Sequence, residues 1–176
     1  GTWGIEQFDS IKGDEEFVKF SSIDTNSAPH ANVDIKPKNI ILVIADGFGF
    51  AHLSLAQILA TEEQLPHFWQ NFEFTGWHKS HPHKGFIIDS AASATAMATG
   101  LDTHNGVVGL DSEGNKPTQL FELAKRHKMK TGIITDSYIW DATPASFIAN
   151  ANSRDDARSL LKQIASSGVD VLIGEL

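Results

Sequence analysis

Cysteine is absent from the 176-residue sequence, which excludes disulfide bonds and thiolate metal ligands. Its absence does not fix the cellular compartment, because cysteine-free chains occur on both sides of membranes. Basic residues are in the minority, with 14 lysines and arginines against 22 aspartates and glutamates and a formal net charge of −8. This balance argues against a nucleic-acid-binding surface, which would carry a basic stripe. It leaves phosphate chemistry open, because a bound cation can reverse the local field.

Long hydrophobic runs are also missing. The longest one, from Ile40 to Ala45, is far too short for a transmembrane helix. The phosphate-binding patterns G-x-x-x-x-G-K-[ST] and G-x-G-x-x-G do not occur, so nucleotide-binding folds of those types have no support. The composition that remains, 41% hydrophobic and 20% charged, is typical of a globular domain with a hydrophobic core.

Strand and helix patterns alternate from residue 39 onward. Asn39 to Ala45 is a continuous, β-branched, apolar run, which predicts a strand buried on both faces. Shorter strands are predicted at 74–78, 85–88, 131–135 and 169–173. Helices are predicted around 53–59, at 90–99 with Gly100 as the C-cap, at 117–128 and at 155–167. This alternation predicts an α/β fold, a three-layer sandwich with a mostly parallel central sheet.

The predicted domain occupies residues 39–176, and the polar, weakly periodic residues 1–38 are interpreted as an N-terminal extension or linker. The first residues contain no methionine and no signal-peptide pattern. We therefore expect either that a leader has been removed or that the sequence begins inside a longer chain. A buried strand just before Leu176 likewise leads us to expect an incomplete sheet in a protein that continues further.

Polar side chains follow three of the predicted strands. Asp46 follows the first strand, Asp89 and Ser90 follow residues 85–88, and Asp141 and Thr143 come shortly after residues 131–135. Ligands of open α/β sheets bind beyond the carboxyl ends of the strands. We therefore expect these clusters to converge on a single site.

Ser90 is the candidate nucleophile. It precedes an alanine-rich helix, where free backbone N–H groups and the helix dipole would favour a phosphate on its hydroxyl. An ordinary serine hydroxyl needs a base or a metal to activate it, and no adjacent histidine is evident. The plainer alternative is that Ser90 is only a helix N-cap.

Oxygen-bearing residues around Ser90 are candidate metal and phosphate ligands. Asp46 lies before a glycine and can approach a cation closely, although a turn or N-cap aspartate is the alternative. Asp141 and Thr143 offer the hard oxygen ligands that magnesium prefers. Arg154 could hold phosphate oxygens in a bidentate manner, although a solvated surface arginine is the alternative.

Three histidines, His78, His81 and His83, form a local cluster. Their spacing fits neither a helical metal-binding pair nor a zinc finger, and the neighbouring Lys79 and Lys84 would repel a cation. We interpret the cluster as a solvated loop rather than a zinc site.

Four segments, taken in order, resemble the alkaline phosphatase family, and Ser90 lies in the most characteristic of them. They are Asn39 to Gly49 (NIILVIADGFG), Asp89 to Gly100 (DSAASATAMATG), Asn105 to Asp111 (NGVVGLD) and Asp141 to Ala145 (DATPA), with Arg154 following. One such motif would be weak support, whereas an ordered series is strong. The resemblance extends from about Asn39 to Leu176.

The resemblance implies a metal-dependent phosphomonoester hydrolase that uses two zinc ions and one magnesium ion. Ser90 would attack phosphorus, lie against the metals and become a phosphoserine that water then hydrolyses. Asp46 would bridge a zinc and the magnesium, Thr143 would ligate the magnesium, and Asp141 would support that site through metal-bound water. Arg154 would hold the non-bridging phosphate oxygens.

The sequence departs from the family pattern at several positions, and some of these departures bear on metal binding and activity. Ala45 and Phe48 replace a glycine and a methionine that are common in the first motif, and Asp141 replaces a histidine found in many members, a difference linked to metal preference. The family's remaining zinc and magnesium ligands come from later sequence and have no counterpart before Leu176. We therefore expect this chain alone to be a poor catalyst or none.

Two other functions are compatible with the sequence. A phosphodiesterase or sulfatase-type relative would share the metal frame, and a non-catalytic fragment that binds phosphate or one metal belongs to a different class. The resemblance also implies a periplasmic or extracellular location. The expected partners are a phosphomonoester substrate and a missing C-terminal half, and a homodimer is left open.

Overall fold

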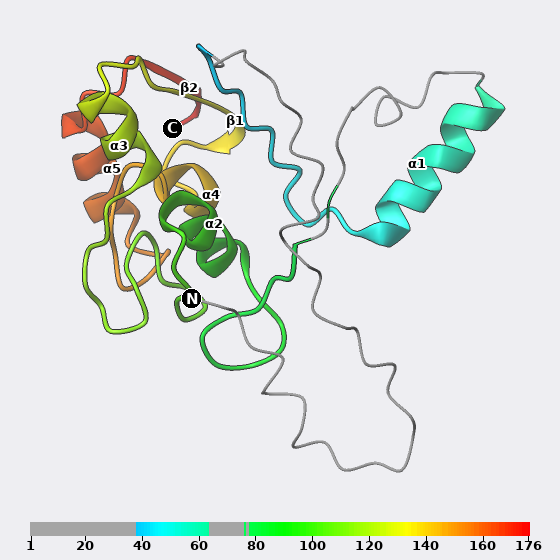
Figure 1. Cartoon of the computed structure of the whole chain (residues 1–176), viewed down its shortest axis with the longest axis horizontal. Coiled ribbons are helices and arrows are strands. Elements are labelled where there is room, and N and C mark those ends of the chain that lie inside the picture. The colour runs from blue at the N-terminus through cyan, green and yellow to red at the C-terminus, as the bar shows by residue number, and fades with distance from the viewer. Residues whose placement is uncertain (1–37, 64–75, 77) are drawn as a thin grey trace, which may run out of the picture. The chain divides into compact units, whose positions relative to one another are not determined.

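The computed structural model describes residues 38–63, 76 and 78–176 (Figure 1). It divides into two units, Gly1–Val43 and Ile44–Leu176. The described residues of the first unit, 38–43, are exposed and belong to no helix or strand. The domain boundary expected after residue 38 stays a prediction, and so does the role of residues 1–37, which lie outside the described part.

The second unit contains every described helix and strand. They are, in order, α1 (Phe50–Glu62), α2 (Ser90–Thr99), α3 (Leu120–Arg126), β1 (Gly132–Tyr138), α4 (Ala142–Ala145), α5 (Ala157–Ser166) and β2 (Val171–Glu175). Within the described residues, no helix is both long enough and apolar enough to span a membrane.

The two strands pair in parallel, with Gly132 opposite Val171 and Ile134 opposite Ile173. Parallel pairing needs a crossover connection, and α4 and α5 lie in the chain between the strands. Asp170 ties the strands together, because its carboxylate accepts hydrogen bonds from Lys130 Nζ at 2.7 Å and Thr131 N at 2.9 Å. The Lys130 hydrogen bond and then the Thr131 N–H hold the pKa of Asp170 below its usual value. The predicted α/β class with a parallel sheet is confirmed.

Helix ends follow the expected chemistry. Gly100 ends α2 with a left-handed φ of 76°, and its N–H donates to the Ala96 carbonyl at 2.8 Å. The predicted helix at 117–128 is shorter in the structure, because the buried side chain of Gln119 donates to the carbonyl oxygens of Ser146 and Ala149. This residue therefore remains extended as the N-cap of α3.

The predicted strands at 39–45 and 85–88 are wrong for the described structure. Both segments lie outside the strands of the structure, and Ile41 and Phe86 are about nine-tenths exposed, at 89% and 91%. A β-branched apolar run becomes a strand only where a neighbouring backbone takes its hydrogen bonds. Neither segment forms a β-ladder or β-bridge with another described residue. The strand predicted at 74–78 falls largely outside the described residues.

Helix α2 lies at the centre of the packed part of the second unit, where it contacts α3 and α4 (Figure 1). Its buried residues are alanines and Thr95, so the helix can approach its neighbours closely. Thr95 Oγ1 donates to the Val107 carbonyl at 3.3 Å and accepts from Gly109 N at 2.8 Å. These bonds attach the loop after α2 to the helix itself. Ala91 of α2 packs in one buried hydrophobic cluster with Leu160 and Ile164 of α5.

We predict different effects for Gly109→Ala and Gly114→Ala. Both glycines have a left-handed φ, 64° and 83°, and an added Cβ at Gly114 meets nothing, whereas at Gly109 it would collide with the Ala149 carbonyl. Gly114→Ala should lower the free energy of unfolding by about 1 kcal/mol through backbone strain alone. Gly109→Ala should lose about 1–3 kcal/mol more from overpacking. Urea denaturation of both variants measures the difference, and equal losses would contradict the packing described here.

Candidate active site

Asp89 organises the start of α2. One carboxylate oxygen accepts from Ala92 N at 2.9 Å, which caps the helix, and the other accepts from Gly106 N at 2.8 Å. Ser90 is the first residue of the helix and is half-buried. The alternative in which Ser90 merely caps the helix is therefore wrong, because Asp89 performs that role.

Arg154 connects Ser90 to two aspartates. Its Nη1 donates to Ser90 Oγ at 2.9 Å, and its Nη2 donates to Asp141 Oδ1 at 3.0 Å. Nη1 also lies 3.6 Å from Asp89 Oδ2. With its side chain 32% exposed and held at three points, Arg154 is not the solvated surface arginine that the alternative describes.

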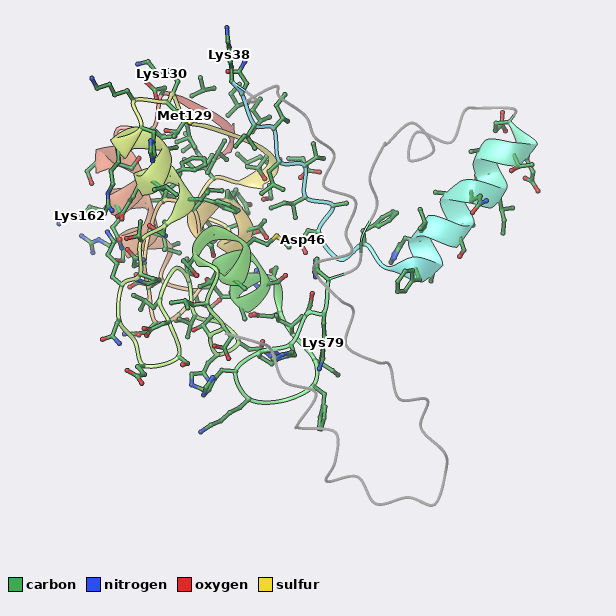
Figure 2. All side chains as sticks on the ribbon, viewed as in Figure 1. Lys38, Asp46, Lys79, Met129, Lys130 and Lys162 are labelled. Carbon is green, nitrogen blue, oxygen red and sulfur yellow. The ribbon has the colours of Figure 1, made fainter. Side chains whose placement is uncertain are left out.

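Asp46 and Thr143 form a second contact. Asp46 lies in the turn that contains Gly47, whose φ is 69°. Its Oδ2 accepts a hydrogen bond from Thr143 Oγ1 at 2.7 Å (Figure 2 labels Asp46). Thr143 belongs to α4, and Asp141 is the N-cap of that helix, accepting from Ala142 N at 2.7 Å. Two residues 97 positions apart in the chain thus meet through their side-chain oxygens.

The five residues predicted for the site form two linked groups. Arg154 joins Ser90 to Asp141, and Thr143 joins Asp46 to α4. Asp141 and Thr143 flank Ala142 at the start of α4, so one short helix belongs to both groups. The geometry brings the five residues into this arrangement, while their chemical roles stay predictions.

Two residues that support this arrangement were not predicted as site residues. Asn105 pairs with the backbone of Ile87 and Asp89, and Gly106 binds Asp89 and the backbone of Arg154. The Asn-Gly pair is a turn signal, and it opens the third segment of the family resemblance. Nothing in its spacing indicated which distant residues the turn would hold.

The histidine cluster lies in the irregular segment that precedes α2. His78 and His83 are exposed, His83 Nδ1 lies 2.9 Å from Asp102 Oδ2, and the ring of His104 meets that of His83 edge-on at 5.1 Å. His83 therefore contacts Asp102 and His104, which belong to neither of the two groups described above.

The family model described as alkaline phosphatase matches residues 37–171, which includes all five predicted site residues. The chain belongs to the alkaline phosphatase family. It is 30% identical to alkaline phosphatase 3 of Bacillus subtilis over 89% of this chain. It is 35% identical to an alkaline phosphatase of Escherichia fergusonii over 74% of it.

Solved structures of the family resemble the chain in three dimensions. Alkaline phosphatase from the Antarctic bacterium TAB5 matches 77% of this chain with a TM-score of 0.70 and 31% identity. A variant of that enzyme, in which aspartate replaces a histidine and Mg is bound in the M3 site, matches with a TM-score of 0.69 and 33% identity. The chain spans only part of these relatives, 38% and 29% of the two bacterial sequences and 39% of the TAB5 chain.

The described residues do not fit the two zinc ions that the family resemblance implies. Among residues 38–63, 76 and 78–176, no three histidine, cysteine, aspartate or glutamate side chains gather in a way that could hold a metal ion. Zinc sites normally use three or four such ligands. Magnesium fits better, because it keeps several waters and needs only one or two carboxylates. The carboxylate oxygen of Asp46 and the hydroxyl oxygen of Thr143 lie 2.7 Å apart, and both are hard oxygen ligands that suit magnesium.

We predict that Asp89→Ala destabilises the protein more than Asp156→Ala. Asp156 caps α5 by accepting from Ser159 N at 3.1 Å, so its loss should cost about 1 kcal/mol. Asp89→Ala removes a similar cap and also leaves Gly106 N without its acceptor, which should add about 1–2 kcal/mol. The free energy of unfolding from urea titration compares the two variants. Equal destabilisation would show that the Asp89–Gly106 bond contributes nothing.

Proposed function

We propose that this chain supplies the nucleophile and the phosphate-binding arginine of a metal-dependent phosphomonoester hydrolase. The proposal rests on one observation, the 2.9 Å hydrogen bond from Arg154 Nη1 to Ser90 Oγ. A guanidinium that contacts the serine oxygen is placed to bind the oxygens of a phosphate whose phosphorus that serine attacks. Family membership supports the same reaction class.

Binding of the phosphate would use two sources of positive potential. The planar fork of Arg154 can donate to two phosphate oxygens. Ser90 stands at the N-terminus of the ten-residue helix α2, where first-turn N–H groups and the helix dipole favour an anion. Asp141 orients the guanidinium through its 3.0 Å contact. Substrate binding would replace the bond between Arg154 and the serine hydroxyl and leave the Ser90 oxygen facing phosphorus.

The proposed reaction proceeds in two displacements. In the first, the Ser90 Oγ–P bond forms while the bond from phosphorus to the substrate alcohol oxygen breaks. The serine proton is lost to solvent, and the alcohol takes one up. In the second, water attacks the phosphoserine, the Oγ–P bond breaks, and Ser90 recovers a proton as inorganic phosphate leaves. Because the same serine accepts and returns the phosphoryl group, Ser90 is the catalytic residue.

Asp46, Thr143 and Asp141 would hold a magnesium ion, with Asp141 acting through bound water. Bound magnesium would offset the negative charge of the site and help to activate a hydroxyl or a water. Magnesium bound in the TAB5 variant, where an aspartate replaces a histidine, supports this choice of metal. Zinc has no role in the steps proposed above, because the described residues do not fit it.

Full activity would require protein segments beyond those that this chain provides. The chain spans 38% of the Bacillus subtilis relative, and its described residues hold no three-ligand metal group. We propose that the other metal ligands come from sequence equivalent to the unmatched part of the relatives, on the same polypeptide or on another. A periplasmic or extracellular location and a homodimer stay predictions.

Complementation tests the proposed activity. The chain alone should not hydrolyse p-nitrophenyl phosphate, whereas co-expression with the unmatched C-terminal region of the Bacillus subtilis relative should restore hydrolysis. Ser90→Ala should then reduce turnover by at least about a thousandfold. Ser93→Ala on the same helix is the matched control and should retain most of it. Restored activity that survives Ser90→Ala would refute the assignment, and preference for a bis-aryl phosphate would favour a diesterase.

Magnesium binding can be tested without turnover. Titration of the chain with Mg²⁺, followed by amide NMR shifts, should perturb residues around Asp46 and Thr143. Asp46→Asn and Thr143→Val should each weaken binding by about tenfold, because each removes one oxygen ligand or its charge. The exposed Asp136→Asn removes the same charge elsewhere and should leave the affinity unchanged. Equal affinity in all variants would contradict the proposed site.

A further inference from the structure

The Asn105 side chain pairs with the backbone immediately before the nucleophile. Its Oδ1 accepts from Asp89 N at 3.0 Å, and its Nδ2 donates to the Ile87 carbonyl at 2.9 Å. One amide therefore engages both a donor and an acceptor of residues 87–89, as a neighbouring strand would. This segment has no strand partner among the described residues, so the amide supplies the hydrogen bonds that a sheet would otherwise give.

The next residue, Gly106, reaches the other half of the site. Its N–H donates to Asp89 Oδ2 at 2.8 Å, and its carbonyl accepts from Arg154 N at 2.7 Å. Two residues further on, Val108 and Ala151 exchange backbone hydrogen bonds, each of 2.9 Å, in an antiparallel bridge. The segment before Ser90 and the segment carrying Arg154 are thus fastened to a single dipeptide.

We propose that Asn105 is a positioning residue that sets Ser90 in register with Arg154. The dipeptide Asn105-Gly106 holds the backbone on either side of the 2.9 Å contact between Arg154 Nη1 and Ser90 Oγ. Movement of residues 87–89 would shift the start of α2, and the serine oxygen would move with it. The catalytic meaning of this role rests on the proposed function, whereas the positioning itself does not.

The amide group explains why asparagine serves here. Only a side chain with one donor and one acceptor at its tip can satisfy both backbone groups. Asn105→Asp keeps the shape but replaces the donor with an oxygen that faces the Ile87 carbonyl. Asn105→Ala removes both hydrogen bonds and introduces no charge. The exposed Asn152, near Arg154 in the chain, provides matched controls as Asn152→Asp and Asn152→Ala.

The test measures the Ser90–Arg154 contact directly in the 176-residue chain. The guanidinium NMR signals of Arg154 are compared among wild type, Ser90→Ala and the four asparagine variants, with circular dichroism and urea unfolding as folding checks. Ser90→Ala defines the signal that remains when the contact is lost. Both Asn105 variants should shift toward that signal, and both Asn152 variants should match wild type. Affinity for inorganic phosphate, titrated in parallel in the presence of Mg²⁺, should fall by about tenfold in the Asn105 variants.

The outcomes separate this inference from the proposed function. Folded Asn105 variants with wild-type Arg154 signals would overturn the positioning role, and so would failure of both variants to fold, which would indicate a general structural role. Wild-type chain that binds no phosphate in the presence of Mg²⁺ would count against the proposed function alone. Arg154 signals displaced in both Asn105 variants but not in the Asn152 variants would support positioning.

Discussion

The carboxylate of Asp89 holds the site together. Its two oxygens accept from Ala92 N and Gly106 N, and one of them also lies 3.6 Å from Arg154. A single side chain therefore fixes the first turn of α2 and the position of the loop at Gly106. It also contributes to the electrostatic potential around Arg154. Because Ser90 follows directly, the direction of its hydroxyl depends on this anchor. Asp89 can do so because an ionised carboxylate accepts several hydrogen bonds at once.

Close packing around α2 holds the helix that Asp89 caps in a fixed position. The helix buries alanines rather than large side chains, so α4, which carries Thr143, packs directly against it. Thr95 Oγ1 and Ser146 Oγ lie 3.3 Å apart in this contact, and the Ser146 hydroxyl donates to the Ala142 carbonyl at 2.8 Å. Small side chains and the Thr95–Ser146 contact leave little room for one helix to slide over the other. The contact between α2 and α4 thus constrains where Ser90 lies relative to Thr143.

Sequence patterns predicted the local elements better than the long-range ones. Helices α2 and α5 followed from composition, periodicity and their capping residues, since these act within a few positions. Strands β1 and β2 were predicted close to their observed bounds, but residues 39–45 and 85–88 were not strands, because strand formation depends on partners that periodicity does not reveal. The candidate site residues were predicted from the order of the motifs, and their chemical roles stay predictions. Asn105 was missed because its contacts join residues 16 and 18 positions away.

Binding of a phosphate at this site would require added cations, because the charge of the site is mostly negative. Asp46, Asp89 and Asp141 bring three carboxylates, and Arg154 brings one positive charge. A phosphomonoester at neutral pH adds close to two further negative charges. Like charges about 4 Å apart repel by about 1–4 kcal/mol near a protein surface, which a single guanidinium and a helix terminus do not offset. Divalent ions would reverse the sign of this field, so the aspartates that oppose an anion in the bare chain would become the residues that attract it.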